Sequence, residues 1–277
     1  MKKQILLFTM LFFFLQHCGY SPIYSNVDNF KFNFNVIEIQ GNHERAYYNL
    51  AKIYVDNDNK KEAETFLKKA ISLNSEYSKA HFLLAHVFEE TNRKSLAEKH
   101  FELSIKFFKE NAIAHYRLGV MMYNDEEFEK SLAHLKKSAE INPHHAESNF
   151  YIAMILRSDE DASLAKKHFY KALELNPEYS EAYCNIGLTF HDQGKFDEAI
   201  EVYNKCISLT PNYAEVFVNK GNTLKDLDKS QEAIEAYKKA ISLRPNFALA
   251  YNNMGSAFKD LGKLDQSIEL YKKAITF

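Results

Sequence analysis

A period of 34 residues runs through most of this chain and constrains its fold more than any other feature of the sequence. Four of the five prolines stand at this spacing, and they are Pro143, Pro177, Pro211 and Pro245. The period needs no insertion or deletion from Glu44 to Phe277, so seven copies begin at residues 44, 78, 112, 146, 180, 214 and 248. Self-similarity of this kind is typical of proteins built from stacked structural repeats.

Each copy predicts a pair of helices. Apolar residues recur at helical spacing twice per copy, which indicates two amphipathic helices of about fourteen residues. Positions 8, 20 and 27 of the copies hold Ala, Gly, Ser or Cys, and small side chains there let two helices approach closely. Gly194 and Gly262 share position 15 with Asp58 and Asn92, residue types that suit a left-handed turn between helices. Because one pair cannot bury its apolar face alone, we expect the pairs to stack, with the proline at position 32 ending each second helix.

This pattern resembles the tetratricopeptide repeat (TPR) family, which has small residues at these positions, aromatic residues at positions 11 and 24, and proline at position 32. Phe190 and Tyr203 are one such aromatic pair. The resemblance implies an all-α fold, a right-handed superhelical solenoid of about seven helix-turn-helix repeats over residues 44–277, the last of them truncated. The departures from the family pattern are Ser75 and Lys109 in place of proline, and His81, His115 and Asn149 in place of an aromatic residue.

A row of asparagines is the main candidate for binding. In the TPR family the first helices line a concave groove, into which positions 2, 5, 6, 9, 12 and 13 point. Position 6 holds Asn185, Asn219 and Asn253, and Asn222 adds position 9. A row of amides one repeat apart could bind the backbone of an extended peptide, because each amide offers both donors and acceptors. Repeats 5–7 are similar in this respect to those of the protein O-linked N-acetylglucosamine transferases, but Asn is also common at position 6 throughout the family, whatever the partner.

Aromatic and charged residues extend the predicted groove. Phe82, Tyr116 and Phe150 occupy position 5 of repeats 2–4 and are candidate anchors for a ligand. The alternative is that these rings pack in the core, having exchanged places with the polar residue before each of them. Lys225 and Lys259 at position 12 could grip a polar ligand, although exposed charges are usually only a solvated face.

The N-terminus predicts export. Lys2 and Lys3 precede the apolar run Ile5–Leu15, which has the layout of a secretory signal peptide over residues 1–17. The following "LQHC" resembles a bacterial lipoprotein signal, with Cys18 as the lipidated residue and His17 as a departure from the usual small residue. An ordinary cleaved signal and an uncleaved anchor are the alternatives. Residues 18–43 predict a linker, with a short strand in the alternating stretch "FKFNFNVIEI", and we expect a bacterial periplasmic or outer-membrane protein held by its lipid.

No catalytic, metal-binding or cofactor motif is found in the sequence. The histidines are scattered, and Cys184 and Cys206 lie 22 residues apart without metal-ligand spacing. We therefore expect Cys206 to be a buried small residue, with a disulfide as the alternative. A formal net charge of −2 gives no reason to expect nucleic acid as a partner.

The sequence therefore predicts a non-enzymatic scaffold that binds a protein or peptide segment. The alternative is the substrate-binding arm of a larger enzyme, such as a protein glycosyltransferase, whose catalytic domain is absent from this chain. The apolar last repeat also allows self-association.

Overall fold

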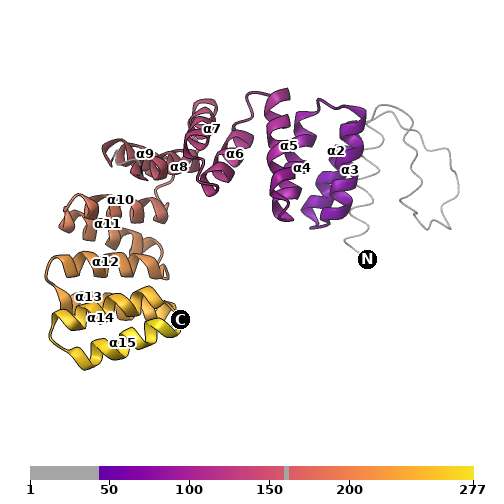
Figure 1. Cartoon of the computed structure of the whole chain (residues 1–277). Helices are drawn as coiled ribbons and strands as arrows, with labels where there is room; N and C mark the ends of the chain where they lie inside the picture. The colour runs from indigo at the N-terminus through magenta and orange to yellow at the C-terminus, as the bar shows by residue number, and fades with distance from the viewer. Residues whose placement is uncertain (1–43, 159–161) are drawn as a thin grey trace. The chain divides into compact units, whose positions relative to one another are not determined.

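The computed structural model describes residues 44–158 and 162–277, and fourteen helices lie in these residues (Figure 1). No strand occurs among them, so the described part of the chain is all-α. The predictions for the signal segment, Cys18 and the short strand concern residues 1–43 and lie outside the described residues.

The helices follow the predicted register in every repeat. The first helices have 13 residues each and are α2 (Glu44–Asp56), α4 (Ser78–Glu90), α6 (Ala112–Asn124), α8 (Ala146–Ser158), α10 (Ser180–Asp192), α12 (Ala214–Asp226) and α14 (Ala248–Asp260). The second helices are α3 (Lys60–Leu73), α5 (Lys94–Phe107), α7 (Phe128–Ile141), α9 (Ala162–Leu175), α11 (Phe196–Leu209), α13 (Ser230–Leu243) and α15 (Leu264–Thr276). The prediction of seven helix pairs is confirmed.

A left-handed residue at position 15 closes each described turn within a pair. Gly194 and Gly262 have φ of 71° and 70°, and Asp58, Asn92, Glu126 and Asp228 have φ between 56° and 62°. In each case the next N–H donates to the carbonyl five residues before it, as from Lys195 to Phe190 over 2.9 Å. This bond defines a Schellman end, in which an otherwise unpaired carbonyl of the helix terminus is satisfied. The turn prediction is confirmed, and it extends to Glu126 and Asp228.

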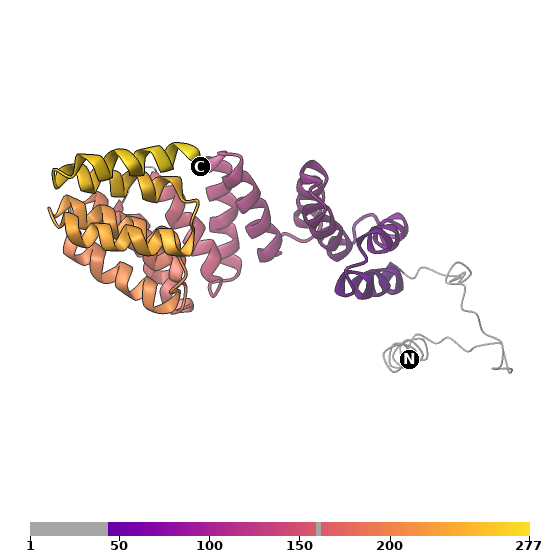
Figure 2. The ribbon, with the colours of Figure 1, turned by 90° about the horizontal axis from the view of Figure 1, so that it is seen from below.

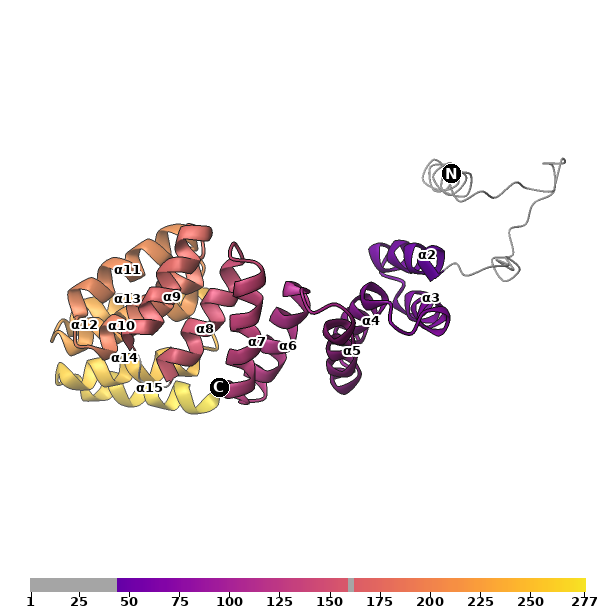
Figure 3. The same cartoon turned by 90° about the horizontal axis from the view of Figure 1, so that it is seen from above.

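Helices that follow one another in the chain pack against one another from α2 to α15. Direct contacts between first helices link α2 to α4, and then α6, α8, α10, α12 and α14 in succession. These first helices therefore form one layer and the second helices another, with the apolar core between them. Figure 2 and Figure 3 show the paired helices from below and from above.

The small residues at positions 8, 20 and 27 are buried where helices meet, as predicted, except Ala274 in the last helix, which is half-buried. Gly187 and Gly221 make the closest approaches, because a Cβ atom added to either would lie 2.4 or 2.5 Å from the Cε1 atom of Tyr203 or Tyr237. Both tyrosine rings are fully buried. Glycine is therefore required at these two positions by the ring beside it.

No helix between residues 44 and 277, leaving aside the undescribed residues 159–161, combines the length and apolarity needed to cross a bilayer.

Candidate functional site

The amides of repeats 6 and 7 are connected across the layer of first helices. The Asn253 Nδ2 atom on α14 donates to the Asn222 Oδ1 atom on α12 over 2.8 Å. The buried Tyr237 hydroxyl donates to the same oxygen, also over 2.8 Å. These two bonds hold the Asn222 amide in one orientation.

Asn219 and Asn222 stand one turn apart on α12 and therefore share a face of this helix. Asn219 uses its Nδ2 atom in a 3.5 Å contact with the Cys184 Sγ atom. Within the residues that the structure describes, the Asn219 Oδ1 atom and the Asn222 Nδ2 atom make no hydrogen bond. The helix thus presents one acceptor and one donor side by side.

The other two asparagines of the predicted row, Asn185 and Asn253, differ from Asn219 in burial and in hydrogen bonding. Asn185 is only 9% exposed, and its Nδ2 atom donates to the Glu181 carbonyl of its own helix over 2.9 Å. The Asn253 Oδ1 atom accepts from the Asn252 Nδ2 atom over 3.1 Å. Equivalent amides in the sequence therefore differ in what they leave available to a ligand.

Charges on the same layer are largely paired between repeats. Arg157 bonds Asp192 over 3.5 Å, and the His191 Nε2 atom contacts the Asp226 Oδ2 atom over 2.9 Å. In both pairs a basic residue at position 12 meets an aspartate at position 13 of the next repeat.

The two lysines predicted for the groove differ from each other. The Lys225 Nζ atom donates to the Ser256 Oγ atom over 3.1 Å. Lys259 is exposed, and its side chain makes no hydrogen bond or ion pair to any described residue. Of the two, Lys259 is the cation that remains available.

The aromatic residues at position 5 are mostly packed. Phe150 is 9% exposed, and its ring centroid lies 4.8 Å from that of Tyr179 and 5.8 Å from that of Phe169. Its burial supports the packing alternative for this residue. The binding roles of all the asparagines, lysines and aromatic rings singled out in the sequence stay predictions.

Phe82 and Tyr116 are half-buried. The Phe82 ring lies 5.7 Å from the core ring of Phe101, and the Tyr116 ring meets His145 edge to face at 4.6 Å. Burial raises the pKa of Tyr116 to about 12. Both rings are therefore packed in part against neighbouring rings and are exposed only in part.

Positions 4 and 23 face each other in the first four repeats, and in repeats 2–4 this contact is a histidine pairing that the sequence analysis did not predict. The Nδ1 atoms of His81 and His100 are 2.9 Å apart, and those of His115 and His134 are 3.0 Å apart. In repeat 4 the His168 Nδ1 atom donates to the Asn149 Oδ1 atom over 3.2 Å. Burial lowers the pKa of all five imidazoles, that of His100 to about 4, so these histidines are neutral near pH 7.

The partners in these pairs are 19 residues apart and lie on different helices, so no short motif contains both. The signal that could have found them is their period. His81 and His115 are 34 residues apart, and the same spacing separates His100, His134 and His168.

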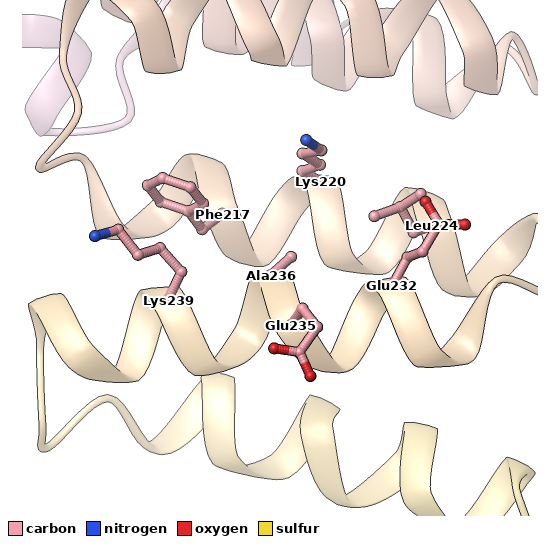
Figure 4. Close-up of a pocket in the computed structure, with 7 residues that line it drawn as sticks. All are labelled: Phe217, Lys220, Leu224, Glu232, Glu235, Ala236 and Lys239. Atoms are coloured by element: carbon pink, nitrogen blue, oxygen red, sulfur yellow. The ribbon is translucent and has the colours of Figure 1, made fainter.

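Repeat 6 has a surface hollow at the same two positions. Phe217 occupies position 4 and Ala236 position 23, and the small alanine leaves a space of about 270 Å³ between α12 and α13 (Figure 4). Lys220, Leu224, Glu232, Glu235 and Lys239 complete its lining. The Lys220 Nζ atom donates to the Asn204 Oδ1 atom over 2.7 Å. The hollow therefore arises where repeat 6 has a smaller side chain at position 23 than the first four repeats. Lysine and glutamate side chains line it.

Cys184 and Cys206 are buried free thiols. The Cys206 Sγ atom donates to the Ser180 carbonyl over 3.2 Å, and its contact with Cys184 together with burial raises the pKa of the Cys206 thiol. Cys206 thus fills a tight position in the core, as predicted. Across the described ranges, no three metal-ligating side chains lie together.

Comparison with known families agrees with the repeat register. A family profile described as a TPR repeat matches residues 187–228 and 221–262. A tetratricopeptide repeat profile matches residues 44–77, 146–179 and 248–277, and a second one matches residues 168–201. The chain is a tetratricopeptide repeat protein. No curated protein sequence matches this TPR protein.

Solved structures of TPR proteins resemble this one in fold. YrrB, described as a TPR protein with an unusual peptide-binding site, is 23% identical, with a TM-score of 0.56 over 66% of this chain and 95% of its own. PilF of Pseudomonas aeruginosa is 18% identical, with a TM-score of 0.64 over 75% of this chain and 94% of its own. A TPR protein of Parabacteroides merdae is 18% identical, with a TM-score of 0.67 over 85% of this chain and 93% of its own.

Proposed function

We propose that this TPR protein is a non-enzymatic scaffold that holds an extended peptide segment against the first helices of repeats 5–7. The observation that carries the proposal is the unpaired acceptor of Asn219 beside the unpaired donor of Asn222 on α12. A peptide unit has one N–H donor and one C=O acceptor, so the two amides complement its backbone without reading its side chains.

The Asn222 amide is held ready for a ligand. The Tyr237 hydroxyl and the Asn253 Nδ2 atom both donate to its Oδ1 atom, which turns its Nδ2 atom away from them. A side chain that is already fixed loses little conformational entropy when a ligand binds. The peptide-binding site that the description of YrrB mentions supports the proposal at the level of the fold.

The paired charges favour recognition of the peptide backbone over recognition of charge. Arg157 and His191 are engaged with aspartates of the next repeat, so neither is available as a free cation. Lys259 is exposed near the end of the row and could meet a carboxylate of the ligand. A neutral extended segment with an acidic residue at one end is therefore the ligand class that fits this surface.

The test begins with a peptide library displayed on phage, selected on the wild-type chain. The affinity of the selected peptides is then measured by fluorescence polarisation for the variant Asn219→Ala with Asn222→Asp. The carboxylate that the second change introduces would still accept from Tyr237 but would lack the Nδ2 donor, so this variant removes both ligand-facing groups and keeps the core bond. Loss of two hydrogen bonds of about 0.5–1.5 kcal/mol each predicts an affinity lower by roughly fivefold to a hundredfold.

The matched control is Asn185→Ala, which removes a buried amide at the same repeat position as Asn219. This control should keep the wild-type affinity. An unchanged affinity of the Asn219 and Asn222 variant, or the failure of any peptide to enrich on the wild type, would contradict the proposal. Circular dichroism of each variant shows whether the helices are retained.

We also propose, from the sequence of residues 1–18 alone, that the scaffold is exported and anchored to a bacterial membrane by a lipid on Cys18.

A further inference from the structure

The histidine pairs of repeats 2 and 3 share one geometry that the proposed peptide binding does not use. In each repeat, position 4 of the first helix and position 23 of the second bring two Nδ1 atoms together, at 2.9 Å for His81 and His100 and at 3.0 Å for His115 and His134. The recurrence of the same atoms at the same separation makes this an arrangement built into two successive repeats.

A backbone partner fixes the tautomer of His81. The His81 Nε2 atom donates to the Ser75 carbonyl over 3.0 Å, so the neutral ring carries its proton there and a lone pair on Nδ1. At His115 the backbone of Lys109 partly offsets the lowering of the pKa by burial, which is the effect expected of a carbonyl that faces this ring. Ser75 and Lys109 occupy the same position of the preceding repeats. A histidine whose second nitrogen donates to a carbonyl is the usual arrangement of a metal ligand.

We propose that each pair is a binding site for one divalent transition-metal ion of the zinc, copper or nickel class, held between the two Nδ1 atoms. Two nitrogen ligands at about 2.0–2.1 Å in tetrahedral geometry are about 3.3 Å apart, so each pair needs to open by only a few tenths of an ångström. Imidazole nitrogen suits these metals, whereas magnesium and calcium prefer oxygen ligands.

Binding leaves the proton count of each pair unchanged. Before binding, the His100 Nδ1–H group donates to the lone pair of His81. When the ion binds, the His100 proton moves from Nδ1 to Nε2, and both rings stay neutral and coordinate through Nδ1. Since no third ligand joins either pair among the described residues, water would have to complete the coordination from the side of the partly exposed His100 and His134. The site is therefore an open one and binds more weakly than a closed four-ligand site.

Surrounding charges distinguish the two sites. Lys68 and Lys99 lie near His100 and act on it as positive charges. At the second pair, Lys137 is balanced by Glu110 near His115. Because like charges repel a dication, the site at His115 and His134 is expected to fill first.

Repeat 4 is an internal control for the chemistry. Asn149 replaces the position-4 histidine there and accepts from the His168 Nδ1 atom over 3.2 Å. The contact between the helices is kept, but the second imidazole nitrogen is missing. A histidine-to-asparagine change at position 4 therefore has a precedent in this fold.

The experiment uses the full chain without a histidine tag, stripped of metal with a chelator and titrated with zinc chloride. Isothermal titration calorimetry should give two zinc ions per chain more for the wild type than for the variant His81→Asn with His115→Asn. At saturating zinc, the melting temperature of the wild type should rise by about 2 °C or more relative to the variant. The control His168→Asn changes a histidine outside both pairs and should bind as much zinc as the wild type.

Equal zinc stoichiometry for the wild type and the double asparagine variant would overturn the proposal and leave the pairs as hydrogen bonds between helices. Circular dichroism of the metal-free variant checks that repeats 2 and 3 remain folded. If the variant loses helix, the single change His115→Asn replaces it and should remove one zinc ion, the tighter of the two.

Discussion

At the scale of single residues, glycine at position 8 makes room for the side chain at position 24 in four repeats. Gly187, Gly221 and Gly255 each face a tyrosine, and Gly119 faces Leu135. Repeats 1, 2 and 4 instead have alanine at position 8, with Leu67, Phe101 and Phe169 at position 24. In repeats 5 and 6 the tyrosine ring therefore occupies the space that an alanine Cβ atom would need.

We predict that Gly221→Ala lowers the free energy of unfolding by about 1–3 kcal/mol, because the new Cβ atom would lie 2.5 Å from the buried Tyr237 ring. The change is expected to destabilise even though alanine is the better helix former by about 1 kcal/mol. Urea unfolding followed by circular dichroism measures the difference.

Gly255→Ala is the matched control for this prediction. Its Cβ atom would lie 3.1 Å from a tyrosine that is only partly buried, so the gain in helix propensity should offset most of the cost. A loss of stability as large for Gly255→Ala as for Gly221→Ala would mean that ring burial does not decide the effect.

At the scale of helix pairs, the contact between positions 4 and 23 changes in chemistry along the chain while the helices keep their places. Tyr47 and Phe66 stack in repeat 1 with ring centroids 6.1 Å apart. Histidine pairs follow in repeats 2 and 3, and repeat 6 has the hollow between Phe217 and Ala236. This position is thus free to vary because the small residues at positions 8, 20 and 27 already fix the helix packing.

We predict that Ala236→Leu raises the free energy of unfolding by about 0.5–1.5 kcal/mol, because the added side chain fills the hollow and covers the Phe217 ring. Leu270 already occupies this position in repeat 7. Thermal and urea unfolding measure the gain. Ala233→Leu, at a fully buried small position of the same helix, should destabilise instead, and equal effects of the two changes would contradict the assignment of the hollow.

At the scale of the whole molecule, α15 presents a surface that the inner second helices bury. Ile234 and Ile268 both occupy position 21, but Ile234 is 1% exposed beneath α14, whereas Ile268 is 52% exposed. Ile275 is 84% exposed at position 28, where Leu173 in repeat 4 is buried. Apolar side chains exposed in this way are typical of surfaces that pack on a partner or on another copy.

We predict that the chain associates with itself through α15 and that Ile268→Lys with Ile275→Lys weakens this association. Sedimentation velocity over a range of concentrations should show a rising sedimentation coefficient for the wild type and a constant one for the variant. Leu96→Lys changes another exposed apolar residue, on α5, and should behave as the wild type. A concentration-independent coefficient for the wild type would contradict the prediction.

The binding surface was only partly predictable from the sequence. Asn185 and Asn219 occupy the same repeat position, yet Asn185 is only 9% exposed and bonded to its own helix, whereas Asn219 is half-buried and its Nδ2 atom contacts Cys184 on the neighbouring first helix. The bonds that orient Asn222 come from Tyr237 and Asn253, which are 15 and 31 residues away. Which polar groups remain available therefore depends on side chains of other helices.

The sequence by itself determined the helices, their pairing and the turns, because these follow from local signals that repeat every 34 residues: apolar spacing, small residues and a left-handed position. Only the tertiary structure decided which side chains meet across helices, such as His81 with His100 or Asn253 with Asn222. The physical reason is that a periodic pattern specifies the backbone of each repeat, whereas a hydrogen bond depends on the positions of two particular atoms. Those positions are set by the packing of neighbouring helices.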